Sequence, residues 1–248
     1  MHGVRTPHPP HMPVSLSGSR LDDPLALRDE MTRLGLPVGA WASKCNSFFS
    51  PCEREPGVGH VLIRKAEWDR IADKTALTLT FVAHDGLDIS FRKLHPVSAP
   101  TPLAQEYRAL NPILWVSLED RRSRLRHVAV GRSYNLRRGD GEWDADTINA
   151  GTPYTWAGVL SALWAKLRAV YADLPAVVPP LPSTPSGTPE SFHFDGANAW
   201  DAFCTVCQAG GLLVRYDPTA EGSGEVTVID PAAAPPPEPA EAVRSRTW

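Results

Sequence analysis

The chain has 248 residues, of which 42% are hydrophobic and 21% charged, and its formal net charge of −3 is that of a globular protein, not of a basic nucleic-acid-binding chain. No apolar run approaches the roughly 20 residues that span a bilayer, and the first 13 residues lack the apolar core of a signal peptide, so we expect no membrane span and an intracellular origin. Proline is the outlier at 25 residues, which disfavours long helices and favours strands, turns and linkers.

The N-terminal part of the sequence predicts an arm, a helix and a loop. Residues 1–20 are rich in Pro, His and Ser without any periodicity, and they predict a flexible arm. Residues 21–57 predict one helix, at 23–35, followed by a long loop. Asp23 can cap that helix and Pro24 suits its first position.

Residues 58–174 predict a β-rich domain that ends in a helix. The clearest sign is a hairpin in which the apolar side chains alternate with polar ones on both arms, around a short Asp-Gly loop. The predicted strands are 58–65, 77–83, 87–93, 113–120 and 125–131. The charged residues 120–124 predict a turn in a meander, and residues 139–153 predict a loop. Thr155 can cap a helix over 155–172, whose apolar stripe is Trp156, Leu160, Leu163, Leu167 and Val170.

The C-terminal third predicts a connector, a compact unit and a tail. Six prolines in residues 175–190 predict an extended connector with polyproline character. Residues 191–230 predict a short aromatic strand, a helix capped by Asn198, and a hairpin after Gly210. Residues 231–248 are rich in Ala, Pro and Glu and predict a disordered tail. The fold class expected is α+β, strand-rich, with antiparallel hairpins or a meander and two or three short amphipathic helices.

The four cysteines raise the question of a metal site. Cys45, Cys52, Cys204 and Cys207 together offer four thiolates, which is a ligand set that zinc accepts. The first pair has six residues between its cysteines, whereas a zinc knuckle usually has two to four, and the second pair lies on the apolar side of a predicted helix. Buried packing therefore explains Cys204 and Cys207 better than zinc or redox chemistry does, and we predict no cofactor.

The residues that suggest contacts with a partner are aromatic or basic. Trp143 and Trp248 lie in polar contexts, where an exposed indole favours a protein interface. Arg121, Arg122 and Arg124 make the middle of the chain locally basic. These arginines are candidates for ion pairs with a neighbouring subunit; contact with nucleic acid, or a solvated sheet edge, are the other interpretations.

Three segments within residues 77–230 resemble a kind of phage tail or baseplate hub protein. They are ILWVSLEDRR (113–122), the Trp-led helix TWAGVLSALWAKL (155–167) before the proline connector, and FHFDGANAWDAFCTVCQAGGLLVRYDP (192–218). The last segment is similar to the hub pattern of aromatic strand, glycine, Ala-Trp-x-Ala helix, glycine and apolar hairpin. A shortened hub, a split hub and another virion component with the same hairpin unit all fit the resemblance.

The resemblance implies a non-catalytic structural subunit of a phage-like tail. Its partners would be other tail or virion proteins and copies of itself, and it would be made in the host cytoplasm and located in the virion. The sequence contains no G-x-S-x-G, phosphate-binding loop or H-E-x-x-H motif, and it gives no catalytic residue to assign. Two alternatives stay open: a tail-associated cell-wall hydrolase, since Ser-His-Asp triads assemble in space, and a zinc-stabilised binding module.

Overall fold

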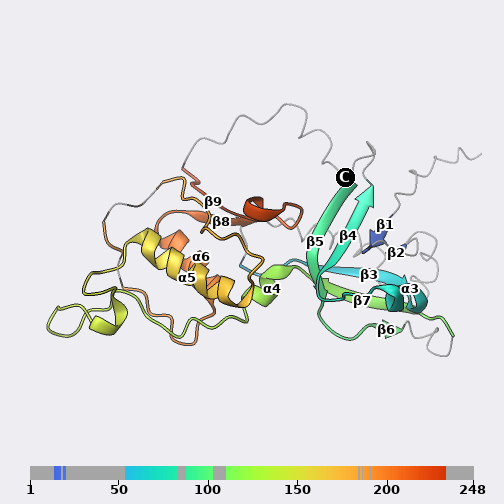
Figure 1. Cartoon of the computed structure of the whole chain (residues 1–248), viewed down its shortest axis with the longest axis horizontal. Helices are drawn as coiled ribbons and strands as arrows, with labels where there is room; N and C mark the ends of the chain where they lie inside the picture. The colour runs from blue at the N-terminus through green and yellow to red at the C-terminus, as the bar shows by residue number, and fades with distance from the viewer. Residues whose placement is uncertain are drawn as a thin grey trace, which may run out of the picture. The chain divides into compact units, whose positions relative to one another are not determined.

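The structure is a computed structural model that describes residues 14–17, 19–20, 54–82, 88–102, 110–183, 185, 187–189 and 191–232. The fold is mixed α+β, as the sequence predicted, with one antiparallel sheet, a separate two-stranded hairpin and four α-helices in the described part of the chain (Figure 1). The chain divides into two compact units. The first contains Glu55–Arg124 and Asp217–Glu221, and the second contains Leu125–Tyr216 and the residues from Gly222 onward.

The first unit is built on a seven-stranded antiparallel sheet. Its strands run in the order β2-β1-β4-β5-β7-β3, and β6 pairs with β7 beside that path. Two short helices accompany the sheet, α3 (Lys65–Arg70) and α4 (Arg121–Leu125). The strands are β1 (Val14–Leu16), β2 (Ser19–Arg20), β3 (Val58–Arg64), β4 (Leu77–Val82), β5 (Asp88–Pro96), β6 (Thr101–Pro102) and β7 (Ile113–Glu119).

Alternation along the strands places one side of each in the core of this unit. Leu79 pairs with Phe91 across β4 and β5, and both side chains are buried, so the predicted hairpin of period two is confirmed. The predicted strands at 58–65 and 113–120 are β3 and β7, which pair over their full length. The loop between β4 and β5, with its Asp-Gly pair, lies outside the described residues.

The end of the predicted flexible arm is ordered in this sheet. Val14–Leu16 forms β1, which pairs with β4 and with the two-residue strand β2. Leu16 is fully buried in the core of the first unit. The prediction of an arm over 1–20 is therefore wrong for residues 14–16 and 19–20. Strands of two or three residues are too short to show a period of two in the sequence. They gain their stability from the longer strand beside them.

The charged segment after β7 is also different from its prediction. Residues predicted as a turn form helix α4, and the predicted strand at 125–131 is absent, since its one β contact is the isolated bridge Ala129↔Asn198. The predicted strand at 192–194 is likewise reduced to the bridge Tyr134↔Phe192. In both places single pairs of backbone groups join distant segments, so alternation of apolar residues alone overstates the length of sheet.

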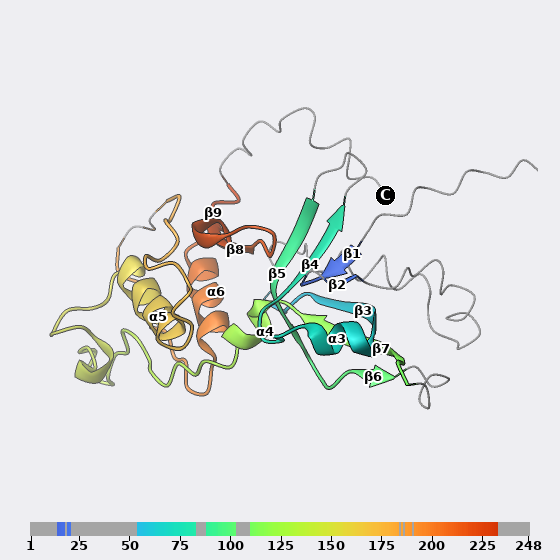
Figure 2. The same cartoon turned by 45° about the vertical axis from the view of Figure 1, so that its right-hand side comes forward.

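The second unit packs two helices and a hairpin around one apolar core. Helix α5 (Trp156–Val170) and helix α6 (Ala199–Ala209) contact each other, with the rings of Trp164 and Phe203 5.5 Å apart. Strands β8 (Leu213–Tyr216) and β9 (Val226–Ile229) form the hairpin, which lies beside α6 in Figures 1 and 2. The predicted domain at 58–174 is therefore wrong in its boundary: α5 belongs with α6, because its apolar face is buried against that helix.

Helices α5 and α6 begin where the predicted caps indicated. Thr155 Oγ1 accepts a hydrogen bond from Gly158 N at 3.1 Å, and Asn198 Oδ1 accepts one from Asp201 N at 2.8 Å. The apolar stripe of α5 is buried at Leu160, Leu163 and Leu167, but Val170 at its end is 59% exposed. The stripe thus covers the core for one turn less than predicted.

The proline connector is held against α5. Trp164 Nε1 donates to the carbonyl of Pro175 at 2.9 Å, and Arg168 Nε donates to the carbonyl of Leu174 at 3.2 Å. Val178 and Leu181 pack on the core of the second unit, so the connector has no separate role as a spacer between cores. In the described part of the chain, no helix is long and apolar enough to cross a membrane.

Candidate interaction surface

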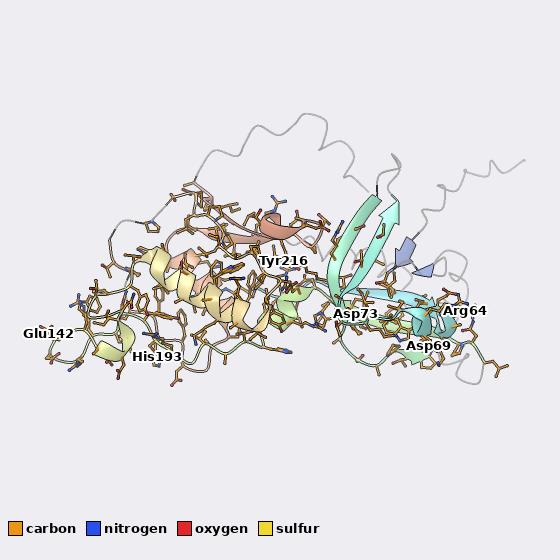
Figure 3. All side chains as sticks on the ribbon, viewed as in Figure 1. Arg64, Asp69, Asp73, Glu142, His193 and Tyr216 are labelled. Atoms are coloured by element: carbon orange, nitrogen blue, oxygen red, sulfur yellow. The ribbon has the colours of Figure 1, made fainter. Side chains whose placement is uncertain are left out.

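A small hairpin over residues 136–144 projects from the second unit. Leu136 O accepts from Asp144 N at 2.8 Å, Glu142 O accepts from Arg138 N at 2.8 Å, and a turn is closed by Gly141 N donating to Arg138 O at 2.9 Å. Arg137 and Trp143 face each other as an isolated bridge. Figure 3 shows Glu142 at the outer end of this segment. We call these residues the 136–144 hairpin.

The sequence predicted a loop over 139–153, and the structure adds to it one isolated bridge, Arg137↔Trp143, which makes 136–144 a small hairpin. The Asp140-Gly141 dipeptide is the signal that would have indicated it, because Gly141 takes a φ of +87° in the turn and Asp140 Oδ1 accepts from Glu142 N at 3.0 Å. The single bridge pair, Arg137 with Trp143, leaves no run of alternating apolar residues. The hairpin is therefore stabilised by hydrogen bonds that a hydrophobic pattern does not display.

The base of the hairpin is fixed by Asn135, whose side chain is fully buried. Its Nδ2 donates to the carbonyl of Tyr154 at 2.9 Å and to that of Pro189 at 3.3 Å, while its Oδ1 accepts from Tyr154 N at 2.7 Å. Its backbone N–H donates to Thr147 O at 2.9 Å. With a φ of +54°, Asn135 has the left-handed conformation that asparagine tolerates better than other residues with a β-carbon.

The hairpin carries a stacked Trp-Arg pair. The guanidinium carbon of Arg137 lies 3.9 Å from the centre of the Trp143 ring, and Arg137 Nη1 donates to Gly141 O at 2.9 Å. Trp143 is half-buried by this stacking. The next arginine, Arg138, is exposed and its side chain has no partner among the described residues. Trp143 was predicted as an interface residue, and this stays a prediction.

Aromatic packing behind the hairpin holds its base rigid. The guanidinium of Arg132 lies over Tyr134 and Tyr154, 5.7 Å and 5.4 Å from the ring centres, and these two rings meet edge to face at 5.3 Å. Tyr134 is fully buried, and this burial raises the pKa of its hydroxyl above the ordinary value. The hydroxyl is therefore protonated at neutral pH and the cluster keeps one charge state there.

An apolar groove lies on the same unit. It has a volume of about 660 Å³ and is lined by Ala157 and Leu160 of α5, residues 175–181 and Val226 of β9, with no charged side chain in its lining. Residues 175–181, here called the proline strap, form one wall. Val177 on the strap is 75% exposed. The carbonyls of residues 177–181 accept no hydrogen bond from the described residues.

The predicted arginine interface is wrong for two of its three members. Arg121 and Arg122 are 3% and 0% exposed, so neither side chain is at the surface for phosphate or for a partner. Arg122 Nη2 lies 2.6 Å from Asp120 Oδ2, and Asp120 also accepts from Gly57 N at 2.7 Å. The Asp120–Arg122 pair lies at the junction between the end of β7 and the start of α4. Because the two charges neutralise each other inside the protein, the charged run 119–122 does not form a solvated sheet edge. Arg124 is half-buried.

The two cysteines of α6 lie in the core. Cys204 and Cys207 are free thiols, 5% and 1% exposed. Desolvation, with a smaller contribution from Cys204, raises the pKa of Cys207 to about 12, so its thiol is protonated at neutral pH. Cys45 and Cys52 lie outside the described residues, as does Trp248. Within the described residues, no three His, Cys, Asp or Glu side chains are placed to share a metal ion.

One pair of polar side chains has the composition of a catalytic dyad. Ser133 Oγ lies 2.9 Å from Nδ1 of His193, brought together by the bridge between Tyr134 and Phe192. His193 is exposed, and no carboxylate of the described residues contacts its ring. A serine nucleophile needs an oriented base and a water-excluding pocket, so this pair lacks what acyl transfer requires.

Comparison with known proteins adds no family. No family model matches the chain, and no curated protein matches it.

Proposed function

We propose that this chain is a non-catalytic structural subunit of a phage-like tail or baseplate, of the hub type, which acts through contacts with neighbouring subunits. The support from the sequence is the resemblance of residues 77–230 to hub proteins. Within that resemblance, the Trp-led helix, the connector and the Ala-Trp-Asp-Ala helix with its hairpin correspond to α5, the proline strap, α6 and β8–β9. These elements lie together in the second compact unit. An assembly module needs such a compact unit in order to present a fixed surface to its neighbours.

The observation that carries the proposal is the 136–144 hairpin. A fully buried asparagine in a left-handed conformation, with three side-chain hydrogen bonds, fixes the base of a hairpin that carries a stacked pair of a half-buried Trp143 and an exposed Arg137. Trp and Arg are the residue types that contribute most energy at the centres of protein interfaces. Because the pair is already ordered, binding loses little further side-chain entropy. This arrangement favours protein contact over catalysis as the role of the unit.

The partners proposed are other tail or virion proteins and further copies of the chain, with synthesis in the host cytoplasm and location in the virion. The contacts would form by burial of Trp143 and of apolar surface, without a cofactor. Such interfaces are specified by shape and by a few anchors, so single substitutions at the surface have large effects on assembly and small effects on folding.

The test is incorporation into particles. The full chain would be produced with the proteins encoded beside it, and tail particles would be purified and analysed by mass spectrometry. The proposal predicts the chain in a fixed ratio to the tail proteins, and its loss from particles on Trp143→Ala but not on Val170→Ser. A chain that is absent from particles and degrades peptidoglycan in a His193-dependent manner would instead support the hydrolase.

A further inference from the structure

Two features of the second unit complement each other in shape and chemistry. The 136–144 hairpin projects and carries an indole and two guanidinium groups, which are hydrogen-bond donors. The groove is recessed, has uncharged walls, and is bordered by the proline strap, whose carbonyls at 177–181 accept no hydrogen bond from the described residues. One unit thus carries a donor-rich aromatic projection and an acceptor-rich apolar recess.

The strap has the properties of a ligand for aromatic side chains. Its residues run between two anchors, Trp164 at Pro175 and the packed side chain of Leu181, with a bend at residues 176–177. Val177 and Pro180 of the strap are both exposed. Proline-rich segments are bound by aromatic rings that stack on their exposed side chains and by donors that bond their free carbonyls. Trp143 and Arg138 supply both kinds of group.

The two features do not meet within one copy. Figures 1 and 2 both show the segment that carries the hairpin, in yellow-green, extending from the unit on the side away from β8 and β9, while the groove is bordered by the start of β9. A contact between a projection and a recess at different places on one molecule is heterologous. Repeated, such contacts generate rings or filaments.

We infer that copies of this chain associate head to tail, with the 136–144 hairpin of one copy seated on the proline strap and groove of the next. Trp143 enters the groove, Arg138 donates to strap carbonyls, and the turn carboxylates of Asp140 and Glu142 stay in solvent. This inference rests on the proposed function, of which it names one partner. The contact joins one short hairpin to one groove, so we expect association in dilute solution to be weak and to strengthen when a ring closes.

The test uses sedimentation velocity on the full-length chain up to about 1 mM, where contacts of this strength are populated. The wild-type chain is expected to associate as its concentration rises. Trp143→Ala on the hairpin and Val177→Asp on the strap are each expected to weaken association at least about tenfold. The matched control is Val170→Asp, an exposed valine of the same unit that does not line the groove, and it leaves association unchanged. Circular dichroism confirms that each variant is folded.

Mixing the two defective variants decides the geometry. Trp143→Ala retains an intact strap and Val177→Asp an intact hairpin, so an equimolar mixture forms one productive contact and stops at two chains. A mixture that stays monomeric, a wild-type chain that is monomeric at every concentration, or variants that associate like the wild type overturn the inference. If the chain is monomeric but enters tail particles in a Trp143-dependent manner, this inference fails while the proposed function stands.

Discussion

Substitution of Asn135 tests whether the 136–144 hairpin is held by a buried clamp. Asn135→Ala removes the acceptor of Tyr154 N and the donor of two carbonyls, at Tyr154 and Pro189. It also places alanine at a φ of +54°. A buried N–H left without an acceptor costs about 1–3 kcal/mol, and each lost carbonyl bond about 0.5–1.5 kcal/mol. The left-handed backbone adds about 1 kcal/mol, so we expect a total of about 3–7 kcal/mol.

Asn135→Gly separates the two contributions. Glycine loses the same side-chain hydrogen bonds but adopts the positive φ without steric penalty, so it should be about 1 kcal/mol less destabilised than alanine. Urea denaturation, followed by tryptophan fluorescence, measures both free energies of unfolding. Hydrogen exchange at the amides of Arg138 and Asp144, which close the hairpin, should lose protection in both variants. A loss below about 1 kcal/mol in the alanine variant, with those amides still protected, would refute the clamp.

Four further predictions concern the stability of the fold and the reactivity of its buried thiol. Asp120→Ala leaves Arg122 buried without its carboxylate and should lower the free energy of unfolding by about 3–5 kcal/mol. The control is Arg70→Ala, at an exposed ion pair, which should change the free energy of unfolding by less than about 0.5 kcal/mol. Asn198→Ala removes the cap of α6 and should cost about 1 kcal/mol in urea denaturation, and a cost near zero would contradict the cap. Because the pKa of Cys207 is raised from 9.0 to about 12, iodoacetamide at pH 8 should alkylate Cys207 about a thousandfold more slowly in the folded chain than in urea, as followed by mass spectrometry of its peptide. Below pH 9 the Cys207 thiol is protonated in both the folded and the unfolded chain, so its contribution to stability is fully present. As the pH rises from 9 toward 12, the unfolded thiol deprotonates first and the free energy of unfolding falls. A free energy of unfolding that increases over this range would contradict the raised pKa.

The elements that the sequence predicted correctly are those whose information is local. Alternation at Leu79 and Phe91 places β4 and β5, and the caps at Thr155 and Asn198 start α5 and α6. Each depends on residues within a few positions along the chain. The buried Cys204 and Cys207 also follow from the helical repeat, because both fall on the apolar face of α6.

What the sequence could not predict depends on partners distant in the chain. Arg122 is buried because Asp120 neutralises it and Gly57, 63 positions before Asp120, completes the carboxylate's hydrogen bonds. Asn135 acts through Tyr154 and Pro189, 19 and 54 positions away. Neither separation leaves a periodic pattern. The hairpin that presents Trp143 was therefore predicted as a loop, although Trp143 itself was selected for its polar surroundings.

The most direct test of the account is the composition of purified tail particles from cells that produce the full-length chain with the proteins encoded beside it. The account predicts that the wild-type chain is present in a fixed ratio to the tail proteins. It also predicts that Trp143→Ala removes the chain from particles while the Val170→Ser control leaves it in place. Particles that lack the wild-type chain, or that contain the Trp143→Ala variant in the same ratio, would contradict the claim that this protein acts through its interfaces.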